Sequence, residues 1–106
     1  MNRKKLAARA AEDVEKIEAE MKRIGYWQQE PLRPEQLEFQ QAFAMDTMSY
    51  AQWLQFIFLP RVREAIAAEE FPRSSSVGTQ AIREFDGDDN AAGLVALLCN
   101  FDALFA

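Results

Sequence analysis

The feature that most constrains the fold is an uncharged stretch of fourteen residues, 47–60. Within it, residues 53–59 read WLQFIFL, so Gln55 is the only polar side chain there. A helix that is apolar on nearly every side belongs in the middle of a bundle. The stretch is well short of the ~20 residues that a membrane-spanning helix needs. We therefore expect a central buried helix and no membrane span.

Capping residues and prolines predict the limits of this central helix. Ser49 is the expected N-cap, and Gln52, three residues later, completes a capping box that satisfies two backbone N–H groups. Pro60 has no backbone N–H and should kink the helix, which then continues to about residue 70. Pro72 ends it, because the following residues, 71–76, read FPRSSS and form the clearest loop.

Two further amphipathic patterns flank the central helix. Residues 2–24 carry apolar side chains at spacings of three and four, and Gly25 is suited to end that helix. This first stripe consists of Ala10, Val14, Ile17, Met21 and Ile24. A second stripe near the C-terminus consists of Leu94, Leu98, Phe101 and Phe105. Shorter helices are expected at about 34–39 and 79–85, and no segment alternates with the period of a strand.

These patterns predict an all-α fold, a closed four-helix bundle with one or two additional short helices, built by residues 1–106 as one domain. The lone Cys99 cannot form an internal disulfide, which favours a cytoplasmic protein, and its apolar neighbours predict a buried thiol. Gly93 suggests close packing of the last helix against a neighbour. Asp102 lies at the helix end that disfavours negative charge, and the sequence gives no reason for this placement.

The residue inventory excludes several kinds of catalytic and metal site. Without histidine, a Ser-His-Asp triad, a Cys-His pair and a histidine-bearing zinc site are impossible. Residues 86–90, DGDDN, resemble the start of a calcium loop, but Ala91 and Leu97 stand where that loop needs Gly and Glu. We interpret these acids as helix caps and expect no metal and no cofactor.

Charge and apolar surface bear on the partners. Twelve Lys and Arg against seventeen Asp and Glu give a net charge of −5, which argues against direct binding of a nucleic-acid backbone. The basic residues within 3–9 are interpreted as a solvated helix face. The apolar residues 103–106 favour a homodimer.

The richest candidate interaction surface surrounds the central helix. Aromatic side chains and arginine dominate interface hot spots, and an amphipathic partner helix could lie in such a groove. The candidate residues are Trp27, Asp46, Gln52, Trp53, Gln55, Pro60 and Arg61. A structural alternative is that Asp46 and Ser49 cap the helix while Trp53 fills the core. A third reading, a ligand-binding or catalytic site, requires an enclosed polar pocket that contains Asp46 and Arg61.

The same stretch carries a family resemblance. Residues 46–61, DTMSYAQWLQFIFLPR, together with IGYW at 24–27 and the closing residues 97–104, resemble the YqcC-like family of small bacterial proteins. The resemblance implies a four-helix bundle. Members are sometimes labelled tRNA pseudouridine synthase C, but the Arg-Leu-Asp motif that such catalysis would need is absent from this sequence.

Two functional hypotheses follow. The first is a non-catalytic protein–protein interaction module with a partner that the sequence does not identify. The alternative, implied by the resemblance, is an accessory factor in tRNA modification that associates with a tRNA pseudouridine synthase.

Overall fold

The computed structural model describes residues 2–106, and its first helix, α1, spans Arg3–Arg23. Asn2 caps this helix, since its side-chain Oδ1 accepts a hydrogen bond from the Lys5 N–H at 2.8 Å. Gly25 follows the helix with a φ of 80°, the left-handed conformation that glycine adopts without strain. The predicted helix over 2–24 and its glycine stop are therefore confirmed.

The central helix is continuous but contains one widened turn. It consists of α2 (Tyr50–Trp53), the π-helical turn η3 (Leu54–Phe58) and α3 (Leu59–Ala68). Both halves of the predicted capping box are present, with Gln52 N–H donating to Ser49 Oγ at 3.1 Å and Ser49 N–H donating to Gln52 Oε1 at 2.9 Å. The N–H of Leu59 donates to the carbonyl of Leu54, five residues earlier. The disturbance expected at Pro60 thus takes the form of a π-helical turn just before the proline.

The C-terminal half contains the remaining long elements. α4 spans Val77–Glu84, so it begins two residues earlier than the predicted 79–85, and α5 spans Ala92–Ala103. Short 3-10 helices occupy Pro34–Leu37 (η1), Ala42–Ala44 (η2) and Asp89–Ala91 (η4). Asp88 caps η4 by accepting from the Asn90 N–H at 3.1 Å, as predicted for the acidic run.

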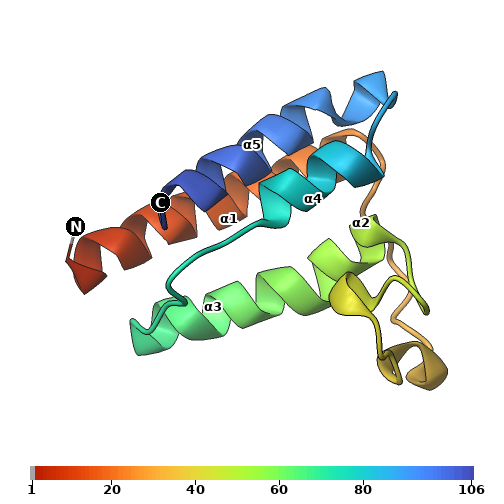
Figure 1. Cartoon of the computed structure of the whole chain (residues 1–106), viewed down its shortest axis with the longest axis horizontal. Helices are drawn as coiled ribbons and strands as arrows, with labels where there is room; N and C mark the ends of the chain where they lie inside the picture. The colour runs from red at the N-terminus through yellow and green to blue at the C-terminus, as the bar shows by residue number, and fades with distance from the viewer. Residues whose placement is uncertain (1) are drawn as a thin grey trace.

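The helices form a bundle in which α5 contacts both α1 and α4, while α3 contacts α1 (Figure 1). The loop after α3 crosses to the start of α4, and the connection between α1 and α2 forms a lobe beside the start of the central helix (Figure 1). No strand occurs in residues 2–106, which makes the fold all-α with four helices once α2, η3 and α3 are counted as one. The predicted fold class is confirmed.

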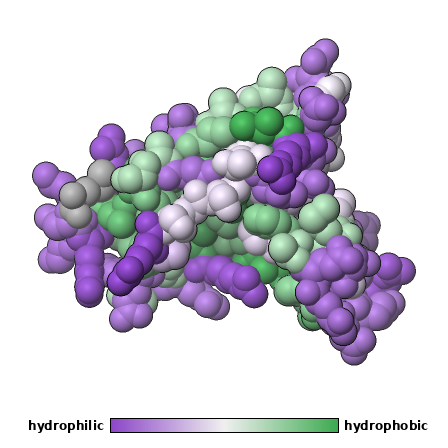
Figure 2. Space-filling view, viewed as in Figure 1, coloured by the Kyte–Doolittle hydropathy of each residue, from purple (hydrophilic) through white to green (hydrophobic). Residues whose placement is uncertain are grey.

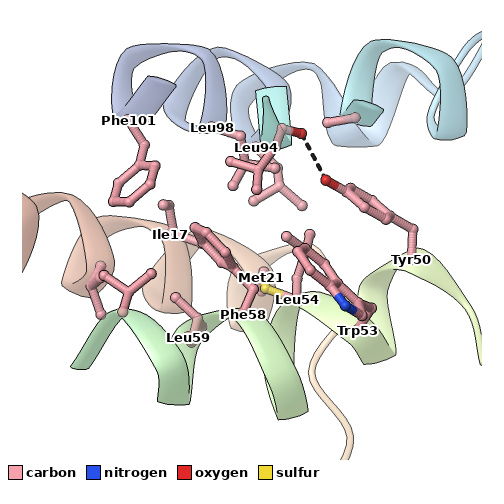
Figure 3. Packing of buried hydrophobic residues seen from close by; sticks show 14 of the residues in the cluster. Ile17, Met21, Tyr50, Trp53, Leu54, Phe58, Leu59, Leu94, Leu98 and Phe101 are labelled. Atoms are coloured by element: carbon pink, nitrogen blue, oxygen red, sulfur yellow. Dashed lines mark hydrogen bonds between the residues drawn. The ribbon is translucent and has the colours of Figure 1, made fainter. Parts of the chain in front are cut away.

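The core lies where the predicted stripes meet (Figure 3). Ile17 and Met21 of α1 are fully buried against the central helix, and so is Leu98 of α5. The other large side chains buried to the same degree are Val14, Leu54, Leu59 and Leu94. Tyr50 closes one end of this core, where its hydroxyl donates to the Val77 carbonyl at 2.7 Å (Figure 3). None of the helices within residues 2–106 has the length and apolar character needed to cross a bilayer.

The prediction of a buried Cys99 is wrong in degree, since this side chain is half-buried. It lies at the contact of α4 with α5, where a Cβ added to Gly78 would lie 2.6 Å from the Cys99 backbone N and Cα. Gly93 lies close to a neighbour, as expected, but that neighbour is the carboxylate end of Glu20 in α1, at 2.6 Å from an added Cβ. The tightest backbone approach is therefore at Gly78 and not at Gly93.

Candidate functional site

A pocket of about 250 Å³ opens between the central helix, the loop before α4 and the end of α5. Its lining is mainly aromatic. The rings come from the central helix (Trp53, Phe58), the loop (Phe71) and α5 (Phe101, Phe105). The first two and Phe101 are buried and form the floor, whereas Phe71 and Phe105 are half-buried and form the rim. We call this site the aromatic pocket.

The five rings of the aromatic pocket contact one another in sequence. The ring centroids of Trp53 and Phe58 lie 5.7 Å apart, and Phe58 meets Phe101 edge-on at 5.2 Å. Phe101 then contacts Phe105 at 5.1 Å, and Phe105 contacts Phe71 at 5.9 Å. All four distances fall within the range of favourable aromatic pairs, roughly 4.5–7 Å. The result is a continuous apolar surface that runs from the core to the rim.

The π-helical turn explains why Trp53 and Phe58 share a side of the helix. In a regular α-helix, residues five apart point about 140° away from each other. A π-helical turn is closed by a hydrogen bond from i+5 to i and holds more residues than an α-helical turn, so residues five apart come closer to one face. The Trp53 and Phe58 rings accordingly lie with only 26° between their planes. The widened turn therefore brings the tryptophan into the pocket lining.

Asp102 holds the loop wall of the pocket in place. Its carboxylate accepts from the hydroxyl of Ser75 at 2.6 Å, from the N–H of Val77 at 3.0 Å and from the N–H of Gly78 at 2.8 Å. Within α4 the N–H groups of Val77 and Gly78 have no hydrogen-bond partner, because they belong to its first turn. Negative charge is favourable at that end of a helix. The position of Asp102, unexplained by the sequence, thus has a structural reason: it caps a different helix.

Arg61 is the one cation in the lining of the aromatic pocket. Its side chain is exposed, and within residues 2–106 it forms no ion pair. In contrast, Arg63 on the same helix binds Glu18 of α1 at 2.6 Å. The hydrogen bond from Lys22, and after it the bond from Arg63, lower the pKa of Glu18. Arg61 is therefore available to an anionic group that approaches the pocket.

Two candidate glutamines hold the connection that follows α1. Buried Gln55 accepts from the backbone N–H of Gln28 at 3.0 Å and donates to the Gln28 carbonyl at 2.8 Å. Gln52 donates to the side-chain oxygen of Gln28 at 3.1 Å. Trp27, directly before Gln28, is half-buried, and the ammonium of Lys22 lies 5.2 Å from its ring centroid. These three candidates form a separate cluster that fixes the connection.

Asp46 serves the second part of the same connection. Its carboxylate accepts from the backbone N–H of Gln40 at 3.0 Å and of Gln41 at 3.4 Å, and the bond from Gln40 is the main reason why the pKa of Asp46 is lowered. Asp46 forms no ion pair with Arg61, and it does not line the pocket that Arg61 lines. The pair on which the ligand-binding reading depends is thus not brought together in this pocket.

The structure therefore divides the seven candidate residues. Trp53 and Arg61 line the aromatic pocket, and exposed Pro60 directly precedes Arg61. Trp27, Asp46, Gln52 and Gln55 lie in the contacts that shape residues 26–48. Sequence reasoning missed Phe71, Phe101 and Phe105 as pocket residues. The available signals were the aromatic residue that opens the FPRSSS loop and the C-terminal apolar stripe, which continues to Phe105.

No group of three or more metal-binding side chains occurs among residues 2–106. The fold and the pocket define a small all-α protein with an aromatic depression edged by arginine. The chain belongs to the DUF446 family, described as "tRNA pseudouridine synthase C", which it matches over residues 9–104.

Relatives from two bacteria match most of the chain. The protein YqcC of Escherichia coli (strain K12), described as uncharacterized, is 29% identical over 92 residues, covering 85% of this chain and 84% of that protein. An uncharacterized protein of Haemophilus influenzae is 27% identical over 77 residues, covering 69% and 73%. The predicted YqcC-like resemblance is confirmed.

A third relative is named for an enzyme. The tRNA pseudouridine synthase C of Pectobacterium carotovorum is 36% identical over 59 residues, which cover 55% of this chain but 16% of that protein. Most of that relative's length therefore lies outside the match. No solved structure matches the chain.

Proposed function

We propose that this protein is a non-catalytic interaction module that binds a tRNA pseudouridine synthase through the aromatic pocket. The observation that carries the proposal is the run of five contacting rings with unpaired Arg61 at its edge. Aromatic residues and arginine are the residue types that contribute most to binding energy at protein interfaces.

The chemistry of the pocket favours apolar side chains of a partner. Its lining is mainly aromatic and apolar, and Arg61 is its one charged side chain. Phe71 and Phe105 at the rim are half-buried, so each leaves apolar surface that a partner could cover. Each such ring contributes by the apolar area that it removes from water on binding.

The choice of partner rests on the Pectobacterium relative. A stretch similar to this chain takes up 16% of a protein named tRNA pseudouridine synthase C. Two segments joined in one chain are held at high effective concentration, and separate chains can reach the same arrangement by binding. We therefore propose that this protein associates with such an enzyme as an accessory factor in tRNA modification, while the enzyme performs the catalysis.

Within the seven-residue candidate surface, the proposal assigns binding to Trp53, Pro60 and Arg61. The polar candidates Asp46, Gln52 and Gln55 act on the shape of the neighbouring connection through their hydrogen bonds. Trp27 stabilises the same connection through its contact with Lys22.

Binding to the tRNA pseudouridine synthase C of the same organism tests the proposal. We expect isothermal titration calorimetry to detect a complex, and Phe71→Ala to weaken it by about tenfold or more. Ile82→Ala is the matched control, because Ile82 is 56% exposed on α4 and does not line the pocket. A failure of the two wild-type proteins to associate, or equal weakening by both variants, would overturn the proposal.

Direct binding to tRNA is the outcome that would replace this proposal. The exposed basic residues Arg3, Lys4, Lys5 and Arg9 could contact phosphates. A gel shift of tRNA by this chain alone, at low salt and without the enzyme, would favour that alternative. We expect no such shift, because the net charge of the chain is −5.

A further inference from the structure

We infer that the aromatic pocket receives an amphipathic helix of the partner whose polar residues are acidic. This inference rests on the proposed function and adds the chemistry of the segment that is bound. It follows from a second depression beside the pocket and from the charges around both.

The second depression has a volume of about 370 Å³ and shares Phe71 and Pro72 with the aromatic pocket. Its remaining lining comes from the start of α1 and from residues around the end of α3: Arg3, Leu6, Glu69, Glu70 and Arg73. Because two residues line both depressions, they adjoin and form one longer groove. Figure 2 shows pale and green residues across the middle of this face, with hydrophilic residues gathered mainly toward its edges.

Three arginines flank this groove. Arg61 belongs to the aromatic pocket, while Arg3 and Arg73 belong to the second depression. All three are exposed, and none forms an ion pair within residues 2–106. The two linings together hold these three arginines and two glutamates, Glu69 and Glu70, so in a chain of net charge −5 the groove is a small local reversal of sign. Such a reversal selects an acidic partner segment and speeds its approach.

The carboxylates near the groove limit where the partner's acids can lie. Glu69 and Glu70 line the second depression, so they oppose acidic groups there. The aromatic pocket has no carboxylate in its lining, and the nearby Asp102 is occupied by three hydrogen bonds. The partner's acids are therefore expected near Arg61 and Arg73, with its apolar residues on the aromatic floor.

A protein segment fits these features better than a nucleic acid does. The two glutamates would repel a continuous phosphate backbone, whereas a helix can place single acids beside single arginines. A helix with apolar residues at i, i+3, i+4 and i+7 presents one apolar stripe, which matches an apolar floor with a charged edge.

Two synthetic peptides test the inference without the enzyme. Both have about 14 residues, or four helical turns, with Leu and Phe on one face. One carries Glu on its polar face and the other carries Lys. We expect fluorescence anisotropy of labelled peptide to show binding of the acidic peptide about tenfold or more tighter than the basic one, with the difference shrinking in high salt.

Charge reversal identifies the groove as the binding site. Arg61→Glu with Arg73→Glu should abolish the preference for the acidic peptide. Lys16→Glu with Arg83→Glu is the matched control, because it makes the same change in net charge at exposed positions outside both depressions. Circular dichroism checks that all variants fold. The inference is wrong if neither peptide binds, if both bind equally, or if both double variants act alike.

The outcome for the proposed function is separate. If the enzyme binds but its affinity changes neither with salt nor with Arg61→Glu and Arg73→Glu, the acidic-helix inference fails. The proposed interaction with the enzyme then still holds. If the acidic peptide binds but the enzyme does not, the choice of partner is wrong. If labelled tRNA competes with the acidic peptide for the wild-type groove, the groove binds nucleic acid and the inference is overturned.

Discussion

The carboxylate of Asp102, near the end of α5, accepts a hydrogen bond from the backbone N–H of Gly78 at 2.8 Å, in the first turn of α4. Ser76, the residue before α4, makes no side-chain cap of its own. One helix therefore supplies the cap of its neighbour, and the same carboxylate also holds Ser75 in the wall of the aromatic pocket.

Replacing Asp102 with Ala should lower the free energy of unfolding by about 1–2 kcal/mol, because the start of α4 loses its acceptor. Asp102→Asn keeps one acceptor oxygen and should lose less. Urea denaturation measures both values. Equal stability of wild type and Asp102→Ala would contradict the capping role.

Gly78 and Gly93 should respond in opposite ways to an added methyl group. In Gly78→Ala the new Cβ would meet the backbone of Cys99 at 2.6 Å, so α4 and α5 must move apart, at a loss of roughly 1–3 kcal/mol. In Gly93→Ala the new Cβ would meet the movable end of Glu20, and the better helix propensity of Ala should leave stability equal or raised by up to about 1 kcal/mol.

Thermal unfolding of the two alanine variants measures this contrast. Cys99→Ala is not expected to rescue Gly78→Ala, because the clash involves backbone atoms as well as the sulfur. Rescue by Cys99→Ala would show that the sulfur, and not the close approach of the two helices, makes glycine necessary at this position.

Gln55→Ala should destabilise the protein by about 1–3 kcal/mol, because both backbone groups of Gln28 would lose their partner. The loss should be local, so hydrogen exchange of the Gln28 amide should accelerate more than that of Leu98 in the core. Gln52→Ala is the comparison: it removes a side-chain partner of Gln28 and the acceptor of the Ser49 N–H, so its effect on exchange should appear at Ser49 and not at the Gln28 amide. Uniform acceleration across the chain would contradict a local role.

Alkaline unfolding should depend on Tyr50. Burial raises the pKa of its phenol above the ordinary value of 10.0, so the folded state holds this proton more tightly than the unfolded chain does. The stabilisation is complete below pH 10 and is lost as the pH rises through the folded pKa. The free energy of unfolding should therefore fall above about pH 10.

Tyr50→Phe should reduce this pH dependence, while it costs about 0.5–1.5 kcal/mol at neutral pH through the lost bond to the Val77 carbonyl. The hydrogen bond to Asp88 also raises the pKa of Tyr26, so Tyr26→Phe is the necessary comparison. Denaturation at several pH values measures both. An unchanged alkaline slope in Tyr50→Phe would contradict the assignment.

The homodimer expected from residues 103–106 remains a prediction. Phe105 packs on Phe71 and Phe101 within its own chain, so part of that apolar surface is already covered. Sedimentation velocity over a range of concentrations should show an average mass that rises with concentration. A constant monomer mass would contradict the prediction.

The helices were predictable because their signals are local. The spacing of Val14, Ile17 and Met21, the capping box at Ser49, and the stop at Gly25 each act within a few residues. The pocket was not predictable in the same way, because Phe58, Phe71 and Phe105 meet only after three segments fold together. Likewise, the cap that Asp102 gives to α4 joins residues 24 or more positions apart.

The candidate polar residues show why a motif can mislead. Gln52 and Gln55 are candidate contact residues because they lie beside the aromatic residues and Arg61 of the central helix. Gln52 completes the predicted capping box at Ser49, but both glutamines also bond to Gln28, in a connection with no periodic pattern that would predict its path. A buried amide that satisfies a distant backbone has the same sequence appearance as one that binds a partner.

The wide turn over Leu54–Phe58 has a consequence for every residue that follows it in the helix. One additional residue per turn advances the rotational phase by about 100°, so it decides which side chains of α3 look toward α5. If the same residues were wound as a regular α-helix, Arg61 and Val62 would rotate by about 100° and away from the rings of α5. Deleting one residue from the turn would instead remove the extra residue together with the wide turn, and it would leave both side chains facing the same way. The orientation of the whole downstream half thus depends on the extra residue that this wide turn absorbs.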